Sequence, residues 1–174
     1  AKGVMEYLSA AAQIKQQYPH VEFLLVGWFE NKDEAIQPTT IQAYIDQGIV
    51  KYLGKLDDVR PALAQTSVFV LPSYREGTPK TVLEAMACGR AIISTDVPGC
   101  REAVVHGDNG LLVPARDIAS LRAALEEFII NPTRIVSMGK RSREIAEAKY
   151  DVNQVNKVIF AAMGLTGTLN AAFS

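Results

Sequence analysis

Short apolar runs alternate with helical patterns along most of this 174-residue chain, and this alternation limits its fold more than any other feature. Apolar and β-branched runs predict strands at residues 21–27, 50–56, 67–72, 91–96 and 110–114. The segments around them predict helices at residues 3–18, 39–48, 59–65, 79–88, 99–105, 117–130, 132–149 and 151–163. Continuous apolar strands suit a sheet covered on both faces. We therefore predict an α/β fold: a doubly wound, parallel, Rossmann-like sheet with right-handed crossovers.

The length of the chain suits one domain with one hydrophobic core, so residues 1–174 are predicted to form a single unit. The sequence opens as if in mid-unit, with Lys2-Gly3 running directly into a helical pattern. We therefore expect the first strand of the unit to precede residue 1. Residues 151–174 are expected to form a C-terminal helix and a tail.

Composition and charge exclude several classes of function. The 18 basic and 19 acidic residues give a net charge of −1, which argues against binding of polymeric nucleic acid. No run reaches the ~18 apolar residues that a membrane span needs, and no signal peptide is recognisable. Cys88 and Cys100 are predicted to be reduced, buried thiols of a cytoplasmic protein, with a disulfide or a metal site as the alternative. No Asp-x-Asp or histidine cluster is available, so neither a metal nor a redox cofactor is predicted.

The segment after the predicted strand at residues 67–72 carries the richest chemistry. In such sheets, ligands bind beyond the carboxyl ends of the strands, at helix N-termini. Thr78 is a good N-cap residue, Pro79 suits the first helical position, and Gly89 suits the helix C-terminus. The free amides of residues 80–82 then form a site for a phosphate or diphosphate. Gly77 allows the backbone to approach the ligand closely.

Two glutamates flank this helix N-terminus. Glu76 precedes the helix and Glu84 lies on its second turn, so their carboxylates are expected on the order of 10 Å apart. This is wider than the ~5 Å between the carboxylates of a retaining glycosidase. The separation suits two clamps on one elongated ligand, with a sugar, a diphosphate and a ribose in that order. The alternative is a surface Glu84 paired with Lys80 and an ordinary loop carboxylate at Glu76.

Residues 76–89, EGTPKTVLEAMACG, resemble the E-x7-E signature of family 4 glycosyltransferases, which are retaining enzymes of the GT-B fold. Residues 91–102 and 109–113 are also similar to that family, and the similarity extends in order from Lys2 to about Ile130. The resemblance implies that the chain is the C-terminal, donor-binding half of such an enzyme. It further implies that an N-terminal acceptor domain and an upstream arginine belong to the whole protein.

The resemblance also assigns roles to individual residues. Glu76 is implied to contact hydroxyls of the donor sugar, Glu84 to hold the ribose, and Lys2 to bind the donor diphosphate. Glu76 and Lys2 are thus the catalytic candidates, although Lys2 could equally be a frayed terminal residue. The base is implied to lie near Leu56. The implied donor-binding residues are Glu76, Gly77, Thr78, Lys80, Thr81, Val82, Glu84 and Leu56.

The function that we predict is binding of a nucleoside-diphosphate sugar for retaining transfer of a hexosyl group, with catalysis by stabilisation of the departing diphosphate. The resemblance favours a UDP-sugar and a bacterial enzyme of surface polysaccharide or lipid-linked glycan synthesis. Such an enzyme is cytoplasmic and associates peripherally with the inner face of the plasma membrane. Three alternatives stay open: a nucleotide-sugar epimerase, a dinucleotide-dependent oxidoreductase and a binding-only α/β module. The oxidoreductase is disfavoured because no G-x-G-x-x-G follows a predicted strand.

Overall fold

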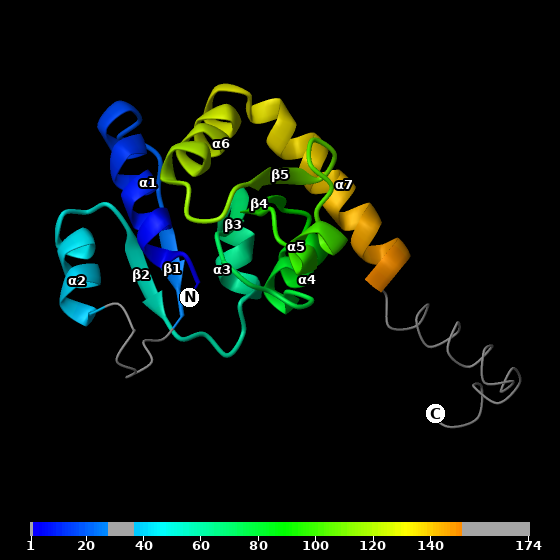
Figure 1. Ribbon diagram of the computed structural model, residues 1–174, viewed down its shortest axis with the longest axis horizontal. Coiled ribbons are helices and arrows are strands. Elements are labelled where there is room, and N and C mark those ends of the chain that lie inside the picture. Colours follow the sequence, from blue (N-terminus) through cyan, green and yellow to red (C-terminus); the bar gives the residue numbers. More distant parts are fainter. Residues whose placement is uncertain (1, 28–36, 151–174) are drawn as a thin grey trace, which may run out of the picture.

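The structure is a computed structural model that describes residues 2–27 and 37–150. Strands and helices alternate as far as residue 113, and two helices follow (Figure 1). The helices are α1 (Val4–Gln17), α2 (Pro38–Asp46), α3 (Arg60–Gln65), α4 (Lys80–Ala87), α5 (Pro98–Ala103), α6 (Ile118–Ile130) and α7 (Pro132–Tyr150). The strands are β1 (Leu24–Val26), β2 (Lys51–Gly54), β3 (Val68–Leu71), β4 (Ala91–Thr95) and β5 (Gly110–Val113). The helix predicted at residues 151–163 lies outside the described residues.

The predicted order of elements is confirmed, but the strands are shorter than their apolar runs. The largest difference is at β1, predicted over residues 21–27 and found over Leu24–Val26. The amide of Val21 donates to the carbonyl of Tyr18, 3.1 Å away, in the turn that follows α1. That amide is therefore unavailable to a strand partner, and regular pairing begins further along the chain.

All strand pairs are parallel, as predicted, but the described residues form two sheets rather than one. β1 pairs with β2, while the second sheet has the order β3-β4-β5. The hydroxyl of Tyr7 on α1 donates to the Leu24 carbonyl of β1 across 3.0 Å. This contact ties α1 to the smaller sheet. The expectation of a further strand before residue 1 stays a prediction.

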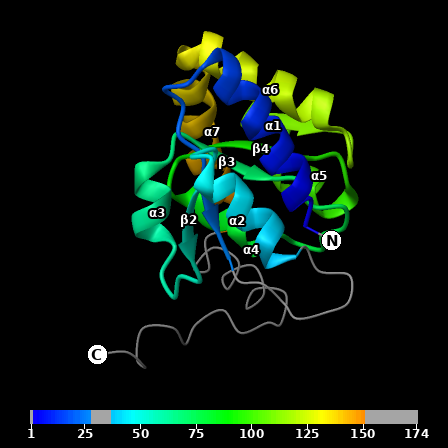
Figure 2. The same ribbon diagram turned by 90° about the vertical axis from the view of Figure 1, so that its left-hand side faces the viewer.

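Helices cover both faces of the larger sheet, which makes the fold doubly wound. All five residues of β4 are buried, and neighbouring side chains of a strand point to opposite faces. Ile93 belongs to a core cluster shared with α1 and α6, whereas Ile92 belongs to a cluster shared with α4 and α7. Figures 1 and 2 show α1 and α6 side by side, with α7 on the other side of the sheet. The loops of the candidate site follow the carboxyl ends of the strands.

Candidate functional site

The loop between β3 and α4, residues 72–79, is held by the end of the neighbouring strand. The Ser94 hydroxyl of β4 donates to the Leu71 carbonyl, 3.0 Å away, and the Thr95 hydroxyl donates to the Ser73 carbonyl. Ser94 and Thr95 are themselves buried. Two side chains of β4 therefore fix the start of the loop that carries Glu76.

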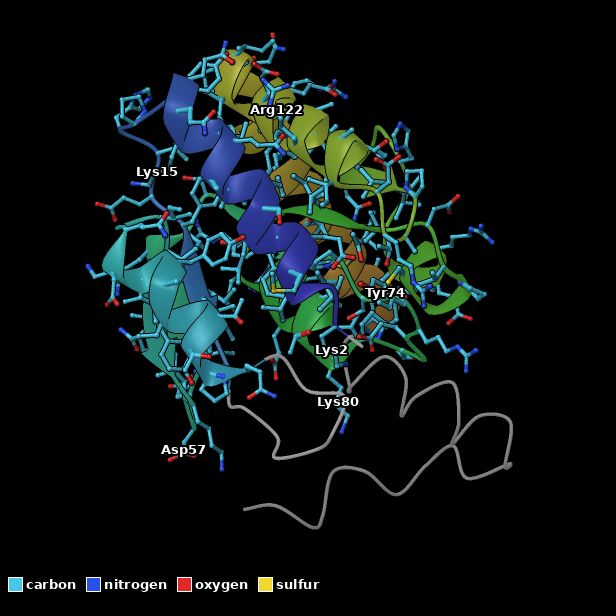
Figure 3. The ribbon with its side chains drawn as sticks, turned by 60° about the vertical axis from the view of Figure 1, so that its left-hand side comes forward. Lys2, Lys15, Asp57, Tyr74, Lys80 and Arg122 are labelled. Atoms are coloured by element: carbon cyan, nitrogen blue, oxygen red, sulfur yellow. The ribbon has the colours of Figure 1, made fainter. Side chains whose placement is uncertain are left out.

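Lys2 and Glu76, the two catalytic candidates, lie in contact in the structure. The Lys2 Nζ atom is 2.8 Å from Glu76 Oε1, and the exposed fractions of the two side chains are 68% and 13%. Lys2 is thus an ion-pair partner of Glu76 in the structure. Figure 3 shows Lys2, Tyr74 and Lys80 at the same end of the molecule.

Gly3 brings Lys2 to this position. Its backbone is left-handed, with φ of 64°, and a Cβ atom there would overlap the carbonyl oxygen of Pro72. Only glycine combines this conformation with so close an approach. The start of α1 therefore rests directly on the loop between β3 and α4.

Gly99, in the first turn of α5, supports the same loop from another side. A Cβ atom on Gly99 would overlap the carbonyl oxygens of Gly77 and Glu76. Glu76 is therefore enclosed between α1 and α5. Sequence reasoning gave Gly99 no role of its own.

The predicted cap of α4 is wrong by one residue. The helix begins at Lys80, and Pro79 rather than Thr78 occupies the N-cap position, with no side-chain cap. The ψ angle of Pro79 is 97°, an extended value that excludes it from the helix. Its carbonyl accepts hydrogen bonds from the amides of Val82 (2.9 Å) and Leu83 (3.2 Å).

This difference also changes which amides are free. Val82 was predicted to offer its N–H group to a ligand, but that group is bonded to Pro79. The amides of Lys80 and Thr81 donate to no backbone carbonyl within the described part of the chain. These two amides and the helix dipole form the positive end of α4.

Glu84 lies on the exposed side of α4. Lys80, Thr81 and Glu84 are exposed, whereas Val82 and Ala85 are buried. Residues three and four apart share a helix face, so Glu84 lies beneath the free amides of Lys80 and Thr81. No ion pair joins Lys80 to Glu84, both of which the structure describes, which leaves both side chains available to a ligand.

The remaining predicted donor-binding residues lie in loops. Gly77 and Thr78 are exposed beside Glu76, and Leu56 is half-buried in the segment after β2. Figure 3 shows Asp57, the neighbour of Leu56, at the lower left of the view, and Lys2 and Lys80 nearer the middle. The predicted residues from Glu76 to Glu84 thus lie around the start of α4, with Val82 in the core, while Leu56 belongs to a separate segment after β2.

The ionisation of Glu76 reflects its position between protein and solvent. Burial is the largest single influence and raises the pKa of its carboxyl, but the hydrogen bond and charge of Lys2, together with Ser73, hold the pKa below its usual value. The buried hydroxyl of Ser73 also favours the ionised form, although its geometry falls short of a full hydrogen bond. Glu76 is therefore an acceptor of hydrogen bonds at neutral pH.

The contribution of Glu76 to stability is expected to disappear in acid. Because its pKa is lower in the folded chain than in the unfolded chain, the stabilisation is present above the unfolded value of about 4.3 and is lost as pH falls through the folded value. Urea unfolding of the wild type and Glu76→Gln from about pH 7 to about pH 3 measures this effect. The difference should be at most about 1 kcal/mol at neutral pH, because Lys2 is exposed, and should vanish in acid. A difference that grows on acidification would contradict it.

Three further features bear on the other sequence predictions. Both cysteines are free, but only Cys100 is buried, and Cys88 is half-buried contrary to prediction. Arg101 pairs with Asp96 at the end of β4, with Nε 2.5 Å from Oδ1. Within residues 2–27 and 37–150, no helix is long and apolar enough to cross a membrane.

The fold is that of a Rossmann-like α/β domain of the GT-B type, and the candidate site lies at the carboxyl ends of parallel strands. Among solved structures, the Anabaena protein HepE in complex with UDP is 25% identical, with a TM-score of 0.83 over 94% of this chain and 45% of that one. Sucrose-phosphate synthase from Thermosynechococcus elongatus is 28% identical, with a TM-score of 0.76 over 92% of this chain and 43% of that one.

The chain belongs to the glycosyl transferases of group 1, whose family model matches residues 1–131. It is 33% identical over 152 residues to N,N'-diacetylbacillosaminyl-diphospho-undecaprenol alpha-1,3-N-acetylgalactosaminyltransferase of Campylobacter jejuni. That match covers 87% of this chain and 38% of the relative. The family resemblance seen in the E-x7-E motif is thereby confirmed. The chain spans well under half the length of this relative.

Proposed function

We propose that the chain binds the nucleoside-diphosphate sugar donor of a retaining, hexosyl-transferring glycosyltransferase. The observation that carries this proposal is the 2.8 Å contact between Lys2 and Glu76 beside the positive end of α4. A cation and two free amides suit the diphosphate, while an ionised carboxylate suits the hydroxyls of a sugar.

The proposed binding mode follows the order of these groups along the edge. Glu76 accepts hydrogen bonds from the sugar, and the amides of Lys80 and Thr81 meet the phosphates. Glu84 holds the ribose hydroxyls, with the base near Leu56. Gly77 and Thr78 line the passage between sugar and phosphate.

Lys2 stabilises the negative charge that develops on the departing diphosphate. Such fixed charges are a large source of catalysis when they are positioned before the reaction. In this mode Lys2 leaves Glu76 for the phosphate, and Glu76 becomes free to accept from the sugar. The proposed chemistry uses no metal and no cofactor besides the donor.

The donor is proposed to be a UDP-sugar, which the UDP complex of HepE supports. The acceptor is proposed to be lipid-linked, because the Campylobacter relative is named for a diphospho-undecaprenol acceptor. An N-terminal domain of the whole protein would supply the acceptor site, in the cytoplasm at the inner membrane face. The 38% coverage of that relative supports a further domain of this kind.

Calorimetric titration of the chain with UDP, UDP-N-acetylgalactosamine, UDP-glucose, GDP-mannose, ADP-glucose and NAD tests the donor class. At least one UDP-sugar should bind more tightly than UDP, and NAD should give no heat. Binding of NAD alone would identify an oxidoreductase domain instead, and no binding of any sugar nucleotide would refute the proposal.

The whole protein tests the reaction class. Incubation with the UDP-sugar and a lipid-linked acceptor should give a product whose anomeric configuration matches the donor, as NMR coupling constants report. An inverted product would contradict retention. Conversion of the free sugar nucleotide to its epimer would identify the epimerase alternative.

A further inference from the structure

Tyr74 links the two segments that carry Lys2 and Glu76. It lies two residues before Glu76, and its hydroxyl donates to Glu6 Oε1 across 2.5 Å. Glu6 lies in the first turn of α1, four residues after Lys2. The hydrogen bond therefore runs parallel to the Lys2–Glu76 ion pair, between the same two segments.

The Glu6 carboxylate is hydrogen-bonded through one of its two oxygens. Its second oxygen, Oε2, is buried and has no hydrogen-bond partner among the described residues. The hydrogen bond to Glu6 raises the pKa of Tyr74, burial raises it further, and the charge of Arg116 opposes both. The Tyr74 hydroxyl therefore stays protonated at neutral pH and can donate.

Arg116 also contacts Tyr74, through the face of its ring. Its guanidinium carbon lies 4.7 Å from the centroid of the Tyr74 ring, a cation–π distance. Arg116 lies between β5 and α6 with φ of 63°, the one non-glycine residue with positive φ in the described part of the chain. Such a backbone is strained for a side chain of this size, and the contact with the ring helps to offset the strain.

The parallel link matters when donor binds. Lys2 must then move from Glu76 to the diphosphate, and the ion pair between the two segments opens. Between residues 2–18 and 72–79, the Tyr74–Glu6 bond is the one hydrogen bond that would then persist. It keeps Glu76 at a fixed distance from the start of α1 while Lys2 changes partner.

We propose that Tyr74, held between Glu6 and Arg116, is a positioning residue that fixes Glu76 for recognition of the donor sugar. The inference rests on the proposed function in naming the sugar as the ligand of Glu76. Tyr74 touches Glu6 and Arg116 rather than the donor, so its effect passes through Glu76.

The test compares Tyr74→Phe with Tyr18→Phe. Tyr18 lies just beyond the other end of α1 and donates to Glu126 Oε1 across 3.1 Å, so Tyr18→Phe removes the same chemical group away from the site. For each variant, calorimetry gives the ratio of affinities for UDP-sugar and UDP. Tyr74→Phe should lower this ratio about 3- to 10-fold with UDP affinity nearly unchanged, and Tyr18→Phe should leave it unchanged.

A double-mutant cycle separates positioning from general stability. In a Glu76→Gln background, Tyr74→Phe should have no further effect on the ratio, because its action passes through Glu76. Arg116→Asn should also lower the ratio, because it removes the contact with the Tyr74 ring. Since asparagine tolerates the left-handed backbone, this change should lower the melting temperature less than a residue that does not tolerate that backbone would. An undiminished Tyr74→Phe effect in the Glu76→Gln background would overturn the inference.

A measurement without ligand distinguishes failure of this inference from failure of the proposed function. In the free chain, loss of the Tyr74–Glu6 bond leaves the Lys2–Glu76 ion pair as the remaining link between the two segments, so this pair should form less often. NMR titration of the Glu76 carboxyl should therefore show its pKa rising towards its usual value in Tyr74→Phe but not in Tyr18→Phe. An equal pKa in the wild type and both variants refutes the positioning role. If that pKa rises as expected while no sugar nucleotide binds the wild type, the proposed function fails and the positioning role stands.

Discussion

Gly99→Ala should weaken binding of a nucleotide sugar by about 30-fold or more. A Cβ atom at Gly99 would overlap two backbone carbonyl oxygens, those of Gly77 and Glu76, and backbone atoms cannot move aside as a flexible side chain can. The loop must shift, and with it the Glu76 carboxylate and the approach to the α4 amides. Several contacts with the donor are then lost together, and each contributes about 1 kcal/mol or more to the binding free energy.

The control for Gly99→Ala is Glu102→Ala, which removes an exposed side chain from the same helix, α5. Calorimetry should show wild-type binding for Glu102→Ala. Urea unfolding should show a loss of about 1 to 3 kcal/mol for Gly99→Ala alone, since overpacking strains the core. Wild-type affinity and stability in Gly99→Ala would mean that the loop adjusts freely, and the rigid support described for Glu76 would be wrong.

Much of the fold follows from local sequence patterns. The strand β4 begins with three apolar residues, Ala91–Ile93, and was predicted to within one residue, because a strand buried on both faces has a distinctive composition. Gly89, predicted at the C-terminus of α4, has φ of 69°, and the Arg90 and Gly89 amides donate to Ala85 and Met86. This Schellman motif depends on local chain geometry, which explains why the sequence predicted it.

The N-terminus of α4 shows where local patterns are insufficient. Thr78-Pro79 matches a common cap pattern, yet Pro79 is itself buried and extended. The tertiary setting of the loop, held by Ser94 and Thr95, moved the helix start by one residue. Propensity alone carries no information about such long-range contacts.

The site shows the same division between local and distant information. Glu76 and Glu84 could be proposed as site residues from their spacing and from the family resemblance, since both belong to one continuous segment. The roles of Gly99 and Tyr74 depend on residues far away in sequence, such as Glu6 for Tyr74. A glycine in the first turn of a helix, where it weakens helix formation, was the available signal for Gly99.

Replacing the two signature glutamates should have different effects on nucleotide and on nucleotide sugar. Glu84→Ala should weaken UDP and UDP-sugar alike, by about 10- to 100-fold, because the ribose that it is proposed to hold is common to both ligands. Glu76→Ala should weaken the UDP-sugar by a similar factor and leave UDP nearly unchanged. Loss of Glu76 also releases Lys2 from its 2.8 Å ion pair, which favours the phosphates of UDP.

Calorimetry of both variants with both ligands measures this division of roles, and the isosteric pair Glu84→Gln and Glu76→Gln tests the part played by charge. A glutamine keeps the shape and one acceptor oxygen but loses the charge-assisted hydrogen bonds, so an intermediate loss is expected. Equal losses of UDP and UDP-sugar in both alanine variants would contradict the assignment. Ribose and sugar would then not be separated along α4, and the exposed Glu84 and the enclosed Glu76 would act on the same part of the ligand.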